Sequence, residues 1–209
     1  MLYLGTTNPG KVAEMAALLA PLGVKLVPVA LDVTETGDTF EENARIKALA
    51  YAEQTGGMTL SEDSGLSIPS LAGLPGPWSA RFADLDLEAR RMRPSGRPRE
   101  EMDRLNTARV LDLMRGVEQP RRAALFEVVL VVAQPGEVLF HARAECHGWI
   151  ATEARGDNGF GYDPIFVGQD TFGRTFAELD PVRKNLRSHR KRVLDELFMW
   201  ASQNRGLLS

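Results

Sequence analysis

The sequence predicts an α/β protein in which helices pack against a mixed β-sheet. Its first 29 residues run apolar segment, loop, amphipathic segment, apolar segment, which is the order of a parallel βαβ unit. Two strand-like runs at 123–133 and 138–149 flank Pro135-Gly136, as in an antiparallel hairpin. With 209 residues, 44% of them hydrophobic, the chain has the size and composition of one globular domain, residues 1–209.

The N-terminal elements surround a glycine-rich loop. We expect a strand at 2–4, the loop Gly5–Lys11, a helix at 11–22 and a second strand at 24–29. Two glycines and a proline let the N–H groups of the loop converge on an anion, and the helix start and Lys11 add positive potential. An ordinary strand-to-helix turn without a ligand is the alternative interpretation.

The same loop satisfies GxxxxGK, the first seven positions of the phosphate-binding P-loop. A P-loop needs a Ser or Thr hydroxyl at the eighth position to hold Mg²⁺, and Val12 stands there. A P-loop kinase or phosphatase is therefore an alternative function that Val12 argues against.

A second helix is predicted at 40–54, after a capping box formed by Thr39 and Glu42. Asn43 and Lys47 lie four residues apart on a face of their own, either as solvated side chains or as part of a site. The apolar face consists of Phe40, Ala44, Ala48 and Tyr51.

A third strand at 58–60 runs into Ser61–Leu66, where two acids are adjacent. Carboxylates at a strand end suit a divalent metal and a general base, and a plain acidic turn is the alternative. Because neighbouring side chains of a strand point to opposite faces, Glu62 and Asp63 need a bend at Ser64-Gly65 to act together.

The middle of the chain predicts irregular segments around one helix. Residues 71–83 are rich in glycine and proline and should form a loop. Residues 85–104 alternate in charge, which favours a solvated excursion over a nucleic-acid patch. A helix should follow at 99–115, with Leu105, Val110, Leu113 and Met114 facing inward.

The last third of the chain contains a glycine-rich segment and a basic helix start. Three glycines around Phe160, within residues 156–166, allow a flat ring to be presented to a ligand, although a simple turn is the alternative. Asp180-Pro181 should begin a C-terminal helix with a core stripe of Val193, Leu197, Trp200 and Ala201. Cations among its first residues oppose the helix dipole and suggest an anion, with a solvated face as the alternative: Lys184, Arg187, His189, Arg190, Lys191 and Arg192.

Composition excludes several classes of protein. The net charge of −3 provides no overall basic field for nucleic acid. One cysteine and three scattered histidines exclude a disulfide framework and a Cys/His zinc site, but leave an oxygen-ligated Mg²⁺ or Mn²⁺ open. No segment resembles a signal peptide or a membrane span, so we expect a cytoplasmic protein without a membrane partner.

Five motifs, in order, resemble those of the inosine triphosphate pyrophosphatase family, also called Ham1-like or RdgB-like. They span nearly the whole chain, and their shared order makes the resemblance specific. The matching segments are Thr6–Lys11 (T-x-N-x-x-K), Ser61–Leu66 (D/E-D-S-G-L), Pro75–Phe82 (P-G-x-Y-S-A-R-Y), Gly159–Phe166 (G-F-G-Y-D-P-I-F) and Ser188–Arg190 (S-H-R).

The resemblance implies an elongated mixed sheet with flanking helices, two lobes around a central cleft, and a homodimer. It also implies Mg²⁺-dependent hydrolysis of ITP, dITP and XTP, noncanonical purine nucleoside triphosphates, to the monophosphate and pyrophosphate. Donors aimed at a 6-oxo group would leave the 6-amino group of ATP mispaired. A nucleic-acid-binding module that uses Arg90–Arg99 and the cations of the C-terminal helix is a third hypothesis.

The resemblance also implies residue roles. Lys11, Lys47 and Asp63 would be catalytic, with Asp63 as the base for the attacking water. Glu35, Glu62 and Asp63 would hold the metal. The substrate would be contacted by Thr6, Thr7, Asn8, Pro9, Gly10, Lys11, Ser64, Phe160, Gly161, Tyr162, Asp163, Lys184, His189 and Arg190, with Phe160 stacked on the purine.

The chain departs from the family pattern at four places. Glu62 replaces a common Asp, Thr7 a common Gly, and Trp78 a Tyr. The Arg-rich segment 85–104 is longer than usual, which leaves its role undefined. The change at Glu62 keeps the ligand chemistry of a carboxylate.

Overall fold

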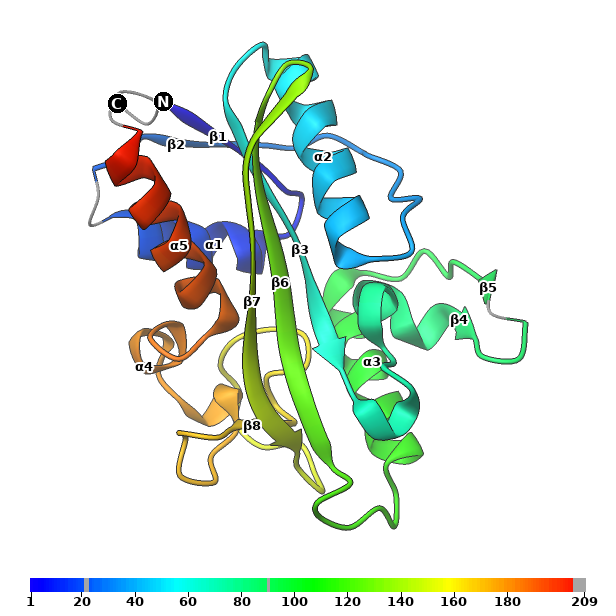
Figure 1. The fold of residues 1–209 in the computed structure, drawn as a ribbon. Coiled ribbons are helices and arrows are strands. Elements are labelled where there is room, and N and C mark those ends of the chain that lie inside the picture. The colour runs from blue at the N-terminus through cyan, green and yellow to red at the C-terminus, as the bar shows by residue number, and fades with distance from the viewer. Residues whose placement is uncertain (21–22, 90, 205–209) are drawn as a thin grey trace. The chain divides into compact units, whose positions relative to one another are not determined.

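The computed structural model describes residues 1–20, 23–89 and 91–204 (Figure 1). Six strands form one mixed sheet in the order β2-β1-β3-β6-β7-β8, and helices flank it, which confirms the predicted fold class. The pair β4 (Leu85–Asp86) and β5 (Arg91–Met92) stands apart. The sheet strands are β1 (Leu2–Gly5), β2 (Leu26–Val29), β3 (Thr59–Ser67), β6 (Ala123–Gln134), β7 (Glu137–Ile150) and β8 (Phe166–Gly168). The α-helices are α1 (Pro9–Leu19), α2 (Phe40–Thr55), α3 (Arg99–Leu113), α4 (Pro181–Asn185) and α5 (His189–Gln203).

The chain divides into two compact units. Unit 1 comprises residues 1–64, 127–145 and 188–209, and unit 2 comprises residues 65–126 and 146–187. The single domain, its lobes and the central cleft stay predictions. No helix in the described residues is long and apolar enough to cross a membrane.

In unit 1, strand β6 is buried on both of its faces. Parallel pairing of β1 with β2 and with β3 confirms the βαβ beginning of the chain. Successive side chains of β6 point to opposite faces of the sheet. Helices α1 and α5 cover one of these faces, and α2 covers the other (Figure 1). Val128, Leu130 and Val132 cluster with α1 and α5, whereas Val129, Val131 and Ala133 cluster with α2.

Unit 2 has its own aromatic core. The ring of Phe166 lies 4.4 Å from the ring of Phe126 and 5.0 Å from the ring of Phe176, measured between centroids. Val110 and Met114 bring α3 and its C-cap into the same cluster. These contacts anchor α3 by its apolar side chains.

Several predicted elements differ from the observed ones. Residues 76–84 form a 3₁₀ segment inside the predicted loop. Leu105 and Leu113 are more exposed than expected, because α3 buries Met102, Asn106, Thr107 and Val110 instead. The helix predicted from Pro181 onward is two helices, since Ser188 is the N-cap of α5 and its side chain accepts from Lys191 N. The predicted end of the first helix at Pro21-Leu22 and the position of Arg90 lie outside the described residues.

The bend expected at Ser64-Gly65 is absent, because β3 is an unbroken strand from Thr59 to Ser67. Gly65 serves close packing instead. A Cβ atom at Gly65 would lie 2.2 Å from Ser79 Oγ, and this hydroxyl accepts from Leu66 N at 2.9 Å. Since the strand continues, Glu62 and Asp63 point to opposite faces of the sheet.

Candidate functional site

The opening loop is organised by Asn8, which caps α1. Its Oδ1 accepts from Gly10 N at 2.9 Å and from Lys11 N at 3.4 Å, and Thr6 Oγ1 accepts from Asn8 N at 3.2 Å. Pro9 occupies the first helical turn, where a missing N–H costs nothing. The cap aims the side chain of Lys11 from a rigid helix start, whereas the N–H groups predicted to meet an anion already donate to Asn8.

On the face covered by α1 and α5, Glu62 and Arg190 form the centre of a buried charge cluster. Arg190 Nε lies 3.0 Å from both carboxylate oxygens of Glu62, and Nη2 lies 2.8 Å from Oε1. Lys11 Nζ approaches the same Oε1 at 3.2 Å. Ser64 Oγ donates to Glu62 and accepts from Arg190 at 2.9 Å. Four predicted site residues therefore meet on this face.

Glu14 is a member of this cluster that the sequence interpretation missed. Its Oε2 accepts from Arg190 Nη1 at 2.7 Å, and its side chain is almost fully buried. Glu14 follows Lys11 by three residues, so both lie on the same side of α1. The available signal was an acid three residues after a site lysine, between apolar residues of the same predicted helix. His189, beside Arg190 at the start of α5, is also buried.

The charges of the cluster shift its pKa values in a consistent way. Burial raises the pKa of Glu62, but Arg190 and Lys11 outweigh burial and hold it well below its usual value. For Arg190, burial opposes the charged form, yet Glu62 and Glu14 raise its pKa. Burial lowers the pKa of Lys11 despite the nearby Glu62. Glu62 and Arg190 are thus permanently charged at neutral pH.

On the opposite face of β3, Asp63 meets Lys47 of α2. Lys47 Nζ lies 2.8 Å from Asp63 Oδ1 and 3.0 Å from Glu35 Oε2. The solvated-face interpretation of Asn43 and Lys47 is wrong, because both side chains are buried. Asn43 Oδ1 accepts from Gly37 N at 2.8 Å and so orders the segment that carries Glu35.

Asp63 has the features of a poised base. Burial raises its pKa and outweighs the opposing effect of Lys47. For Lys47, burial opposes the charge, but Asp63 and Glu35 raise the pKa. The second oxygen of Asp63, Oδ2, is buried and has no hydrogen-bond partner among the residues that the structure describes. This oxygen can accept a proton or face a cation.

The three predicted metal ligands divide between the two faces. Within the described ranges, no three Asp, Glu, His or Cys side chains form a group that could hold a metal ion. Glu35 and Asp63 meet at Lys47, whereas both oxygens of Glu62 receive Arg190. Mg²⁺ is commonly held by one or two carboxylates together with water and substrate phosphates. Asp63 Oδ2 with Glu35 fits this pattern, and the role of Glu62 as a ligand stays a prediction.

A second group of predicted site residues lies in unit 2. Asp163 Oδ2 accepts from Phe160 N at 2.8 Å and from Lys184 Nζ at 2.5 Å. The ammonium group of Lys184 also lies 4.7 Å from the centroid of the Phe160 ring, a cation–π contact. The side chain of Asp163 thus links the backbone of Phe160 to a buried lysine.

Tyr162 is held inside unit 2. Its hydroxyl donates to Ser79 O at 2.8 Å, and burial raises its pKa well above the usual value of 10.0. The hydroxyl is therefore a neutral donor that joins the glycine-rich segment to the 3₁₀ segment 76–84. Its predicted contact with substrate stays a prediction.

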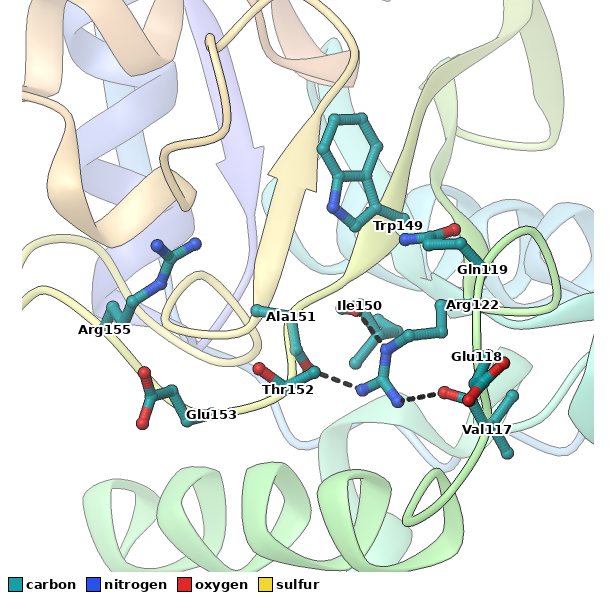
Figure 2. Close-up of a pocket in the computed structure, with 10 residues that line it drawn as sticks. All are labelled: Val117, Glu118, Gln119, Arg122, Trp149, Ile150, Ala151, Thr152, Glu153 and Arg155. Atoms are coloured by element: carbon teal, nitrogen blue, oxygen red, sulfur yellow. Dashed lines mark hydrogen bonds between the residues drawn. The ribbon is translucent and has the colours of Figure 1, made fainter.

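Unit 2 also contains a cavity of about 390 Å³, which none of the predicted site residues lines (Figure 2). Its wall includes Arg122, whose guanidinium donates to four backbone carbonyls. Nε donates to Ile150 O at 2.7 Å and Nη2 to Ala151 O at 2.6 Å, while Nη1 donates to Met114 O and Val117 O. Burial lowers the pKa of this guanidinium. Arg122 therefore connects the end of β7 to the segment before β6 through hydrogen bonds to backbone carbonyls.

Three arginines within residues 85–104 are paired with nearby acids. Arg93 Nη2 lies 2.6 Å from Asp86, Arg97 Nε 3.0 Å from Glu101, and Arg99 Nε 2.8 Å from Asp103. A surface that attracts nucleic acid needs an excess of positive charge. Local pairing with acids weakens the nucleic-acid hypothesis.

Comparison with known proteins identifies relatives along almost the whole chain. The model of the Ham1 family matches residues 2–200. A dITP/XTP pyrophosphatase of Desulforamulus reducens is 42% identical over 198 residues, which cover 92% of this chain and 91% of that protein. A dITP/XTP pyrophosphatase of Streptococcus thermophilus is 42% identical over 204 residues, which cover 95% of this chain but only 58% of that longer protein.

A solved structure has the same fold. The HAM1 protein from Coxiella burnetii superposes with a TM-score of 0.78 at 36% sequence identity, covering 97% of this chain and 98% of that chain. The solved structure and the sequence relatives both indicate the family whose model matches residues 2–200.

Proposed function

The chain belongs to the Ham1 family, and we propose that it hydrolyses noncanonical purine nucleoside triphosphates, such as dITP, ITP and XTP, to the monophosphate and pyrophosphate. The relatives named dITP/XTP pyrophosphatase, at 42% identity, support this activity. The observation that carries it is the burial of two charge groups on β3 in unit 1: Glu62 with Lys11 and Arg190 on one face, and Asp63 with Lys47 on the other. Such a cluster is costly to bury and is typical of a functional site.

The charge balance of the unit 1 cluster suits a polyphosphate together with a cation. The two charge groups on β3 together contain four carboxylates and three cations, so they have no surplus of positive charge for a triphosphate. The carboxylates are those of Glu14, Glu35, Glu62 and Asp63, and the cations are Lys11, Lys47 and Arg190. We propose that Mg²⁺, with Mn²⁺ as the alternative ion, is held by Asp63 and Glu35. When bound, the metal supplies shielding of the phosphate charge.

The protein groups then act as follows. Lys11 and Lys47 bind phosphate oxygens and stabilise the charge that develops as the bond between the α-phosphorus and the bridging oxygen breaks. The carboxylate of Asp63 orients the attacking water and accepts its proton, because burial has raised the pKa of this carboxyl group. The water oxygen bonds to the α-phosphorus, and pyrophosphate leaves.

Selection of the base is proposed for the second group of residues. Phe160 stacks on the purine, and Lys184 supplies a donor for a 6-oxo group. A 6-amino group would leave this donor mispaired, which reduces turnover of ATP. Asn8, Ser64, His189 and Arg190 are among the further substrate contacts that the resemblance implies. The homodimer, which the resemblance implies, and the cytoplasmic location, which the sequence predicts, are also proposals.

A panel of nucleoside triphosphates with separate assays for pyrophosphate and orthophosphate tests the function. We expect pyrophosphate from dITP, ITP and XTP, slower turnover of ATP and GTP, and loss of activity with EDTA that Mg²⁺ restores. Orthophosphate as the first product would contradict the proposal. A P-loop mechanism is not favoured, and it would instead respond to Val12→Ser. Salt-sensitive binding of DNA or RNA without any turnover would support the nucleic-acid hypothesis.

A further inference from the structure

The N–H and the C=O of Gly161 both form hydrogen bonds with side chains on one face of α3. Gly161 N donates to Asp103 Oδ2 at 3.1 Å, and Gly161 O accepts from Thr107 Oγ1 at 3.2 Å. Asp103 and Thr107 are four residues apart and therefore neighbours on the helix surface. They are more than 50 residues from Gly161 in the sequence, so only the tertiary fold brings them to it.

The backbone is constrained on both sides of Phe160. Gly159 and Gly161 have φ values of +79° and +61°, a region that side chains rarely adopt. Phe160 N donates to Asp163 Oδ2, and a Cβ atom at Gly159 would lie 2.0 Å from the same oxygen. Phe160 thus lies between two left-handed glycines, one packed against Asp163 and the other bonded to α3.

The contacts of Asp103 are not needed to keep α3 in place. Val110 and Met114, both fully buried, anchor the helix and its C-cap in the core of unit 2. Asp103 also pairs with Arg99, whose side chain is 42% exposed, and such exposed pairs contribute little to stability. The carboxylate of Asp103 is therefore used mainly to hold the glycine-rich segment.

We propose that Asp103 and Thr107 are positioning residues that set the orientation of the Phe160 ring and thereby govern the part of substrate binding that depends on the base. This inference rests on the proposed function, in which Phe160 stacks on a purine. Loss of the two hydrogen bonds lets the segment 159–163 sample other conformations, so the ring is less often in the binding orientation. The phosphate-binding groups of unit 1 do not depend on these bonds.

The test uses Asp103→Ala and Thr107→Val, with Asp112→Ala as the matched control. Asp112 lies on the same helix, is exposed, and its carboxylate pairs with the exposed Arg115. Because a stacked aromatic ring is worth about 5- to 150-fold in binding, we expect the KM for dITP to rise about tenfold in each variant with kcat changed less than about threefold. Inhibition by inorganic tripolyphosphate, which has no base, should be unchanged.

A double-mutant cycle separates positioning from a general structural role. In a Phe160→Ala background, Asp103→Ala should raise the KM little further, because the ring that it positions is gone. Equal weakening of tripolyphosphate inhibition, additive effects in the cycle, or a similar rise in KM for Asp112→Ala would overturn the proposal.

Amide hydrogen exchange provides a readout that does not depend on activity. Exchange within 159–163 should accelerate in both variants and stay unchanged in Asp112→Ala. Unchanged exchange in Asp103→Ala and Thr107→Val would overturn the positioning role, even if the wild-type enzyme is active. A wild-type chain that hydrolyses no nucleoside triphosphate would instead refute the proposed function, and with it the role in base recognition.

Discussion

Arg190 and Glu62 lie 128 residues apart in the sequence and form a fully buried, bidentate ion pair. The planar guanidinium satisfies Glu62 through Nε and Nη2 and still reaches Glu14 through Nη1. A lysine cannot donate in this fixed fork. The pair therefore orients α5, through Arg190, against both β3 and α1.

Arg190→Lys should destabilise unit 1 although it keeps the charge. We expect a loss of about 2–4 kcal/mol in the free energy of unfolding, because buried acceptors on Glu62 and Glu14 lose their donors. Urea denaturation measures this loss. The control is Arg115→Lys in an exposed pair with Asp112, which should change stability by less than about 0.5 kcal/mol. Equal effects of the two changes would show that the buried fork is unimportant.

Asp63→Asn should remove activity and spare the fold. The amide cannot accept the proton of the attacking water, so kcat should fall by about 10²- to 10⁴-fold. Lys47 keeps Glu35 as a partner, and the variant no longer buries the charge of Asp63. The rate of pyrophosphate release and the thermal unfolding midpoint measure the two effects. Near-normal kcat would exclude Asp63 as the base.

Gly65→Ala should disturb the packing of β3 in unit 2. The added methyl group would lie 2.2 Å from Ser79 Oγ and 2.8 Å from Gly76 O, and the latter is backbone. We expect a loss of about 1–3 kcal/mol, typical of overpacking. Ser67→Ala, at the end of the same strand, is the control. A Gly65→Ala protein as stable as wild type would mean that the 3₁₀ segment moves away at little cost.

The pH dependence of stability should reveal the charge of Glu62. Its pKa in the folded state is lowered from the usual 4.5, so its stabilising contribution is complete above about pH 4.5 and is lost as the pH falls further. Glu62→Gln should therefore be less stable than wild type at pH 7, and the difference should shrink below pH 4.5. Thermal unfolding from pH 3 to 7 measures it. A difference that is constant over this range would contradict the lowered pKa.

Asp63 should show the opposite dependence. Burial raises its pKa above the usual 3.8, so its ionisation costs stability as the pH rises through this region. The stability of Asp63→Asn relative to wild type should accordingly be highest at neutral pH and lowest at low pH. The same thermal scans measure this difference, and a gap that widens towards pH 7 would argue against the raised pKa.

Local patterns in the sequence were sufficient for most of the fold. The βαβ order, the capping box at Thr39 and Glu42, and the hairpin at Pro135-Gly136 depend on neighbouring residues, and the structure contains each of them. The order of five motifs likewise identified the family to which the chain belongs. The break before Ser188 was missed, because the basic run continues through it.

Tertiary packing decided the relations between distant side chains. The alternation of β3 assigned Glu62 to Arg190 and Asp63 to Lys47 on opposite faces, although the sequence suggested that the two acids act together after a bend. The contact of Glu14 with Arg190 also depends on how α1 and α5 pack. Sequence alone therefore predicted most of the candidate site residues and most of the elements on which they lie. Only the folded chain decided which charges meet, because burial and pairing over more than 100 residues are set by packing and not by local propensity.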